Sequence, residues 1–176
     1  MAATFVWGED NGAQTAGISG ANRGATRTFG VSNVNWKNID DTTTAYSSSP
    51  ITAGNNSYNK YQFGVFSGSF NQISNVVVNH TGGSFGAGFK LAFTGTSGYA
   101  TPVTTTQTWA DLTLTGLLST GLPLLLGMSS PTTAHKTTLT TTGYTAFISS
   151  QLQTTISAAA GDLASTIFLA VSYDES

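Results

Sequence analysis

The sequence predicts a mainly β fold, a two-layer antiparallel β-sandwich of jelly-roll or immunoglobulin-like type, with one C-terminal α-helix before the last strand. Two observations predict the strands: β-branched and aromatic residues recur with a period of two, and clusters of Gly, Asn and Ser separate these runs. A third predicts the helix, because one late segment has apolar residues at helical spacing. The 176 residues fit one sandwich domain at residues 31–176, preceded by an irregular N-terminal arm or loop region at residues 1–30.

The first 30 residues are the least regular part of the chain. A short strand is expected at residues 4–7, and the run GEDNG at residues 8–12 predicts a turn. The Gly-, Ala- and Asn-rich stretch that follows predicts a long loop, or an arm that becomes ordered only on a partner. We therefore expect residues 8–30 to reach a neighbouring subunit.

The strands of the sandwich are predicted by alternating or continuous apolar residues. They are expected at residues 31–39, 61–65, 66–70, 73–78, 85–94, 111–118 and 122–127. Gly68 suggests a bulge or tight hairpin between the second and third of these strands. Residues 40–59 have the composition of turns throughout.

The predicted helix covers residues 144–156. Its apolar stripe falls at i, i+3, i+4, i+8 and i+12 and consists of Tyr144, Phe147, Ile148, Leu152 and Ile156. Gly161 and Asp162 mark the expected end of the helix. Residues 167–173 then alternate between apolar and small or polar side chains, so the chain is expected to finish with a strand inside a sheet.

The charge content limits the kinds of partner. Only 8% of the residues are charged, against roughly 25% in average soluble domains, whereas Ser and Thr fill 50 positions. The net charge is −2, and the six basic residues are scattered, with Arg23 and Arg27 as one small cluster. Such a surface offers little electrostatic steering and no basic patch for phosphates, so we expect no nucleic acid partner. It suits close packing against other protein.

Other classes of protein are excluded or disfavoured by what the sequence lacks. The absence of cysteine excludes disulfides, thiolate catalysis and Cys-based zinc sites. The N-terminus lacks the basic start and long apolar core of a signal peptide, and apolar clusters such as residues 122–126 are far too short to span a bilayer. We expect a protein that is made in the cytoplasm and has no membrane partner.

No motif predicts a catalytic, cofactor-binding or metal-binding residue. His80 and His135 lie in Ser-, Thr- and Gly-rich segments that predict solvated loops, without a carboxylate at ligand or triad spacing. The acidic residues that could pair for glycoside hydrolysis fit turns and caps better; they are Glu9, Asp10, Asp40, Asp41 and Asp111. The run DNG at residues 10–12 lacks the further ligands of a calcium loop. The run GGSFGAGFK at residues 82–90 lacks the Lys and helix of a phosphate loop and predicts a hairpin and strand.

A sugar-binding platform is an alternative that the aromatic residues leave open. Its best candidates are Trp36, Tyr46, Tyr58 and Tyr61, which lie among many asparagines. Against it, Trp7, Trp36 and Trp109 lie in or beside predicted strands, where aromatic side chains usually serve the core.

Three segments resemble small β-rich virion proteins encoded among the structural genes of tailed bacteriophages. They are VNWKNIDD at residues 34–41, YNKYQFGVFSGSFNQI at residues 58–73, and the closing residues 161–175. The resemblance implies a homo-oligomer located in the virion after synthesis in the host cytoplasm, with other virion proteins as partners. It carries no catalytic motif, so it implies no site residues and no cofactor.

These arguments together predict a non-enzymatic virion structural protein. The first expectation is a capsid decoration or cement subunit that packs on the capsid lattice through contacts with the major capsid protein. A neck, tail or head-fibre component is the alternative within the virion, and a carbohydrate-binding β-sandwich module is the alternative outside it.

Overall fold

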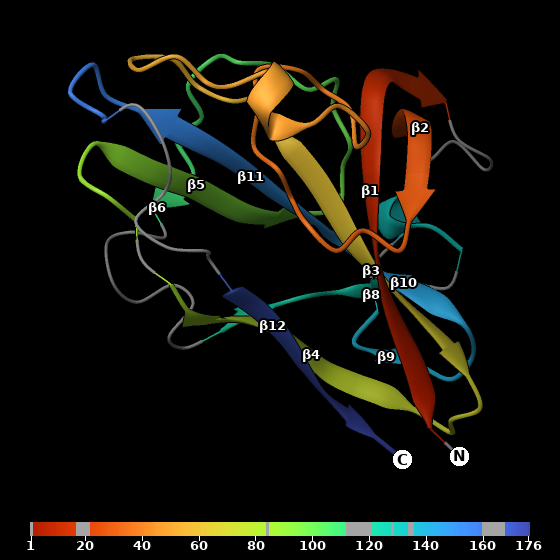
Figure 1. Ribbon diagram of the computed structural model, residues 1–176. Helices are drawn as coiled ribbons and strands as arrows, with labels where there is room; N and C mark the ends of the chain where they lie inside the picture. The colour runs from red at the N-terminus through yellow and green to blue at the C-terminus, as the bar shows by residue number, and fades with distance from the viewer. Residues whose placement is uncertain are drawn as a thin grey trace.

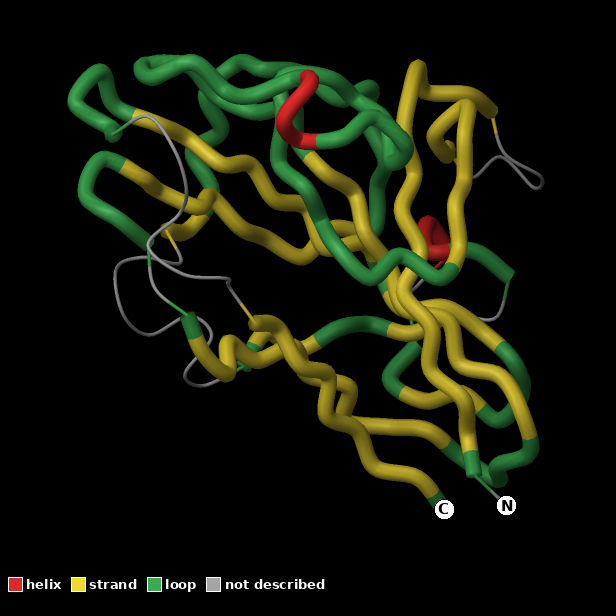
Figure 2. Tube along the Cα trace, viewed as in Figure 1, coloured by secondary structure: helices red, strands yellow, loops and turns green. Residues whose placement is uncertain are grey.

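The computed structural model describes residues 2–16, 22–83, 85–111, 121–127, 129–133, 136–159 and 168–176. Over these residues the chain is mainly β and forms two antiparallel sheets (Figure 1). Its described helical content consists of two short 3-10 turns, η2 (Tyr46–Ser48) and η3 (Pro131–Thr133), shown in red in Figure 2. The prediction of a mainly β chain with antiparallel sheets is confirmed.

The larger sheet has eight strands. Six of them follow one another in the order β2-β1-β3-β11-β5-β6, and β10 pairs with both β3 and β8. The bounds are β1 (Ala3–Ala16), β2 (Asn22–Phe29), β3 (Lys60–Gly68), β5 (Phe89–Thr96), β6 (Ala110–Asp111), β8 (Leu126–Gly127), β10 (Gly143–Thr145) and β11 (Phe147–Thr154).

The smaller sheet has four strands, in the order β12-β4-β7 with β9 also paired to β4. The bounds are β4 (Ile73–Gly82), β7 (Leu122–Pro123), β9 (Thr138–Leu139) and β12 (Phe168–Glu175). The backbone N–H of Ala3 in β1 donates to the Glu175 carboxylate of β12 over 2.8 Å, which ties the beginning of the chain to its end (Figure 1).

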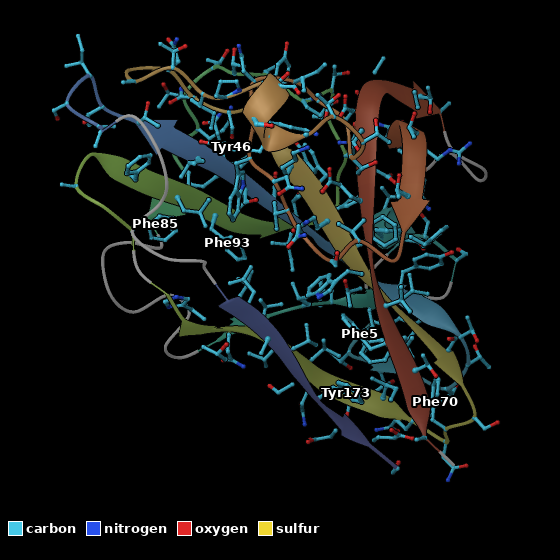
Figure 3. The ribbon with its side chains drawn as sticks, viewed as in Figure 1. Phe5, Tyr46, Phe70, Phe85, Phe93 and Tyr173 are labelled. Atoms are coloured by element: carbon cyan, nitrogen blue, oxygen red, sulfur yellow. The ribbon has the colours of Figure 1, made fainter. Side chains whose placement is uncertain are left out.

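The main hydrophobic core is built from both sheets. Phe66, Leu91 and Ile148 of the larger sheet are fully buried together with Val76 and Val78 of β4, within a single cluster. The Phe66 ring also lies edge-on to the Tyr173 ring of β12, with centroids 4.8 Å apart. Figure 3 labels Tyr173 on β12, near Phe5 and Phe70.

A second cluster lies on the opposite face of the larger sheet and consists of Tyr61, Phe63, Tyr99 and Phe147. Tyr99 belongs to the loop after β5, so this loop covers the second face. The glutamines of β11 hold the loop in place: Gln151 Nε2 donates to the carbonyls of Ser57 and Thr105, and its Oε1 accepts from the Gln107 backbone. The larger sheet is therefore covered on both faces around β11.

The N-terminal region differs from its prediction. Residues 3–16 and 22–29 are the strands β1 and β2, which pair with each other, and β1 also pairs with β3 along eight positions. The glycines that suggested a loop instead permit close packing: a Cβ on Gly8 would overlap the Phe63 ring, and a Cβ on Gly24 would meet the Asn11 backbone. Gly12, at a φ of 84°, lies where the register of β1 and β2 shifts. The expectation of an irregular arm is wrong for these residues.

The predicted C-terminal helix is also wrong. Residues 143–154 form β10 and β11, and no helix occurs among described residues 143–159. In β11, which pairs with both β3 and β5, seven of the eight residues are buried, so apolar side chains point to both faces. Ile148 faces the core between the sheets, and Phe147 faces the second cluster. This two-sided burial produces the helical spacing by coincidence, and strand pairing decides the local structure.

The remaining predicted strands divide into confirmed and corrected ones. Those at residues 73–78 and 167–173 correspond to β4 and β12, and the one at residues 61–65 lies within β3. Residues 31–39 run as a loop outside the strands, and Asn35 within it takes a φ of 49°. Gly68 ends β3 at a φ of 97°, and the chain then crosses to the other sheet. No hairpin forms there.

The later predicted strands are shorter than expected. Residues 85–88 precede β5, and β4 and β5 lie in different sheets, so the hairpin expected at residues 82–90 does not form. The strand predicted at residues 122–127 is two short strands, β7 and β8. Most of the segment 111–118 lies outside the described residues. Within the part of the chain that the structure describes, no helix is long and apolar enough to cross a membrane.

Candidate functional site

A buried polar network lies where β1 and β3 meet the loop of residues 31–59. It consists of Glu9, Asn11, Lys37, Asp40, Asp41, Lys60 and Gln62. Sequence reasoning treated its acidic members as turn formers, yet Glu9 and Lys60 are each about 1% exposed and Lys37 is fully buried. This network is the most distinctive chemical feature of the described chain.

Glu9 lies at the centre of the network. Its Oε1 accepts hydrogen bonds from Lys60 Nζ at 3.0 Å and from Asn11 Nδ2 at 2.9 Å, and its Oε2 accepts from Gln62 Nε2 at 3.3 Å. Burial raises the pKa of the Glu9 carboxyl, and the Lys60 ammonium and the three hydrogen bonds only partly oppose this effect. Asn11 Oδ1 is buried without a hydrogen-bond partner among the described residues.

Asp40 and Asp41 bring the loop into the network. Asp40 accepts from Asn11 Nδ2 at 2.7 Å and from the Gly12 backbone at 2.6 Å. Asp41 pairs with Lys37 at 2.7 Å, and its backbone carbonyl accepts from Lys60 Nζ. Burial alone would raise the pKa of Asp41, but hydrogen bonds from Lys37 and Thr44 outweigh it and lower the pKa well below the ordinary 3.8. Asp41 is therefore a carboxylate, whereas Glu9 is biased toward its acid form.

Asp10 lies on the opposite face of β1. Both of its carboxylate oxygens accept from Arg27 of β2, at 2.7 and 2.8 Å. The Arg27 guanidinium also stacks over the Phe63 ring at 4.7 Å. This bidentate ion pair fixes β2 on β1. Both carboxylate oxygens of Asp10 already accept hydrogen bonds from Arg27, so we assign the pair a structural role.

A pocket of about 430 Å³ opens on the face of the larger sheet that carries the second cluster. It is lined by Tyr61, Tyr99 and Trp109 together with the hydroxyl-bearing Thr94 and Thr96. Tyr99 donates its hydroxyl to the Gly12 carbonyl at 2.7 Å, and burial raises the pKa of this phenol, with the Asp40 and Asp10 charges adding to the effect. Tyr99 is therefore a fixed, neutral wall of the pocket.

Comparison of the chain with protein-family models, curated proteins and solved structures found no match.

The other candidate site residues considered in the sequence do not form a common site among the described residues. His80 lies within β4 rather than in a turn, and its Nε2 is buried without a described partner, whereas His135 lies outside the described residues. The Asp111 side chain also lies outside them. No group of three or more His, Asp or Glu that could hold a metal ion occurs in the described ranges. Arg23 is exposed and Arg27 is paired with Asp10, so the two do not form a basic patch.

The aromatic candidates for a sugar platform are dispersed. Trp36 is half-buried and donates to Ser150 at 3.1 Å, while Tyr61 is 5% exposed and packs against Tyr99. Tyr46 is exposed on η2, and Tyr58 is half-buried in the same loop. Of these four residues, Tyr61 alone lines the pocket. The other two aromatic residues of its lining, Tyr99 and Trp109, were not among the sugar-platform candidates that the sequence suggested.

The surface carries very little charge. Of the charged side chains that the structure describes, four are exposed: Arg23, Lys136, Asp174 and Glu175. The network and the Asp10–Arg27 pair take up three of the six basic and four of the eight acidic residues of the chain. The sequence showed that charge is scarce, but it did not show that half of it is internal.

Proposed function

We propose that the chain is a non-enzymatic structural subunit of a tailed-bacteriophage virion: a capsid decoration or cement protein, built as a two-layer β-sandwich of jelly-roll or immunoglobulin-like type, that packs on the capsid lattice. The observation that carries this proposal is the nearly uncharged surface of the described chain. A partner can cover such a surface without removing water from ions, and the contact then depends on shape and on hydroxyl and amide hydrogen bonds.

The sheet edges give a second line of support. Among the described strands, β2 pairs only with β1 and β12 pairs only with β4, so each presents one free edge. Free edges are the part of a β protein that most readily pairs with another chain. Repeated copies of this subunit on a lattice would have these unpaired strand edges available to them, and three of the four exposed charges lie on the same strands, Arg23 on β2 and Asp174 and Glu175 on β12.

The test is quantitative mass spectrometry of purified virions, followed by rebinding of the purified chain to particles that lack it. We expect a copy number that scales with the capsid lattice, and rebinding that changes little between low and high salt, because few charges are available to be screened. Arg23→Ala, which removes an exposed cation, should rebind normally. A copy number set by the single portal vertex would indicate a neck, tail or fibre component instead. Absence from the particles would refute a role in the virion.

A carbohydrate-binding module is the second candidate, and the pocket favours it because the half-buried side chains of Trp109, Thr94 and Thr96 line it. Aromatic faces and threonine hydroxyls are the groups that sugar rings contact. Titration of tryptophan fluorescence with a panel of polysaccharides tests this candidate, with Trp109→Phe expected to abolish the shift. A panel without any response in the wild-type chain would remove it.

A further inference from the structure

The contacts of Lys60, Glu9 and Asn11 combine a nucleophile, a proton carrier and a leaving group. The amine Nζ of Lys60 and the amide Nδ2 of Asn11 both donate to the same oxygen, Oε1 of Glu9, at 3.0 and 2.9 Å. The two nitrogens are therefore separated by at most the sum of these distances. An oxygen placed between them can take a proton from one and deliver it to the other.

The strand register brings the same residues together. In the pairing of β1 with β3, Glu9 lies opposite Gln62 and Asp10 opposite Tyr61, so continuation of this register places Asn11 opposite Lys60. Directly opposed residues of antiparallel strands have Cβ atoms about 4.5–5.5 Å apart. A lysine side chain can bend across this distance to its neighbour.

The environment favours reaction over a permanent ion pair. The side chains of Lys60 and Glu9 are 0% and 1% exposed, and Asn11 is 3% exposed, so bulk water does not solvate the three groups. Burial raises the pKa of the Glu9 carboxyl, so this group can hold the proton that the attack requires it to accept. The Asn11 Oδ1 is buried without a described partner, so the side-chain hydrogen bonds that hold this amide are those of its nitrogen.

We propose that Lys60 and Asn11 form an intramolecular isopeptide bond, with Glu9 as the catalytic acid and base. The Lys60 ammonium gives a proton to Glu9, and the neutral Nζ attacks Asn11 Cγ, so that a C–N bond forms and the carbonyl electron pair moves to Oδ1. Glu9 passes a proton to Nδ2, the bond between Cγ and Nδ2 breaks, and the carbonyl re-forms. One ammonia leaves and carries the remaining ammonium proton into water. The reaction needs no oxidant and no cofactor, and it occurs once per chain.

Asp40 assists the departure of the leaving group. Its Oδ1 accepts from Asn11 Nδ2 at 2.7 Å, so the leaving nitrogen lies between two carboxyl groups that can stabilise it as it gains a proton. The other buried lysine has no such arrangement: Lys37 contacts Asp41, whose carboxyl is 29% exposed and ionised, and the Thr44 carbonyl. Lys37 is therefore a matched control.

The product would join β1 to β3 covalently and enclose residues 11–60 in a ring. A cross-link of this kind limits the freedom of the unfolded chain in the way that a disulfide does, without requiring cysteine. The chain contains no cysteine, so a bond of this type is open to it where a disulfide is not.

The test is the mass of the purified, fully denatured full-length chain and its tryptic peptides. We expect the chain to be lighter than its sequence by one ammonia molecule, and residues 1–23 to be recovered joined to residues 38–90, because trypsin does not cleave after a modified Lys60. Lys60→Arg and Glu9→Gln should restore the full mass and separate the peptides. Lys37→Arg should keep the cross-link. Circular dichroism of each variant establishes that it is folded.

Two results would overturn the proposal. One is a wild-type chain of full mass that is cleaved normally after Lys60. The other is loss of ammonia from residues 1–23 alone, which would indicate ring closure by the Gly12 backbone nitrogen onto Asn11; that loss would persist in Lys60→Arg.

Discussion

Gln151 offers the most direct test of how the second face of the larger sheet is covered. Its Nε2 donates to the carbonyls of Ser57 and Thr105 at 3.1 and 3.0 Å, and its Oε1 accepts from the Gln107 backbone at 3.0 Å. The Gln151 side chain is fully buried in the middle of β11. Replacement by leucine, Gln151→Leu, keeps a similar volume and removes every one of these contacts.

The cost can be worked out from the groups left without a partner. Thr105 O keeps a second donor, Gln107 Nε2, so the main loss falls on Ser57 O and on the Gln107 backbone N–H. A buried polar group without a partner costs about 1–3 kcal/mol, so we expect Gln151→Leu to lower the free energy of unfolding by about 2–6 kcal/mol. This is a large part of the roughly 5–15 kcal/mol that is typical of a folded domain.

Urea denaturation measures the effect. With a slope of about 1–3 kcal/mol per molar urea, the midpoint should fall by about 1 M or more. Gln14→Leu, the same substitution at an exposed side chain of β1, should change stability by less than about 0.5 kcal/mol. Limited proteolysis should show faster cleavage within residues 97–109 in Gln151→Leu alone. Equal midpoints for the two variants would refute the view that Gln151 holds this loop.

Three further predictions follow from other contacts. Gly64→Ala should destabilise the fold by about 1–3 kcal/mol in urea denaturation, because the added methyl would overlap the Phe5 ring; an unchanged midpoint would mean that the ring moves aside freely. Asp41→Asn should make the free energy of unfolding depend less on pH in acid. The pKa of Asp41 is lowered in the folded state, so its carboxyl contributes stability above the unfolded-state pKa of about 3.8 and loses this contribution as the pH falls. If the free energy of unfolding of the variant falls with pH as steeply as that of the wild type, Asp41 does not have this role. Deletion of residues 2–16 should abolish the β signal in circular dichroism, since β1 pairs with both β2 and β3, and a folded remainder would contradict the strand order.

Sequence patterns predicted the strands correctly where a strand buries one face only, or where its buried residues are all apolar. In β12, Leu169, Val171 and Tyr173 are half-buried and alternate with exposed residues, so the period of two is visible in the sequence. In β4, the apolar run at residues 76–78 is unbroken. Both strands were predicted from these patterns, because local sequence and final environment agree there.

The patterns failed where polar residues are buried. In β11, Ser149, Ser150, Gln151 and Gln153 are all buried, and such residues look like the solvent face of a helix when their partners are unknown. The network around Glu9 was equally invisible, because Lys60 lies 51 residues away and no spacing rule joins the two. A long-range contact of this kind has no local signal.

The internal charges explain how a chain with so few charges specifies the path of its longest irregular segment. Residues 31–59 contain no named strand, and backbone hydrogen bonds to β11 hold only the end of the segment, at residues 55–57. Asp40 instead fastens the segment to the Gly12 backbone of β1, and Lys60 of β3 donates to the Asp41 carbonyl. Buried ion pairs add little net stability, but a misplaced segment would leave a buried charge unpaired at a cost of about 3–5 kcal/mol. The charges therefore select one docked conformation of this loop, and their use inside the molecule is also why so few remain on its surface.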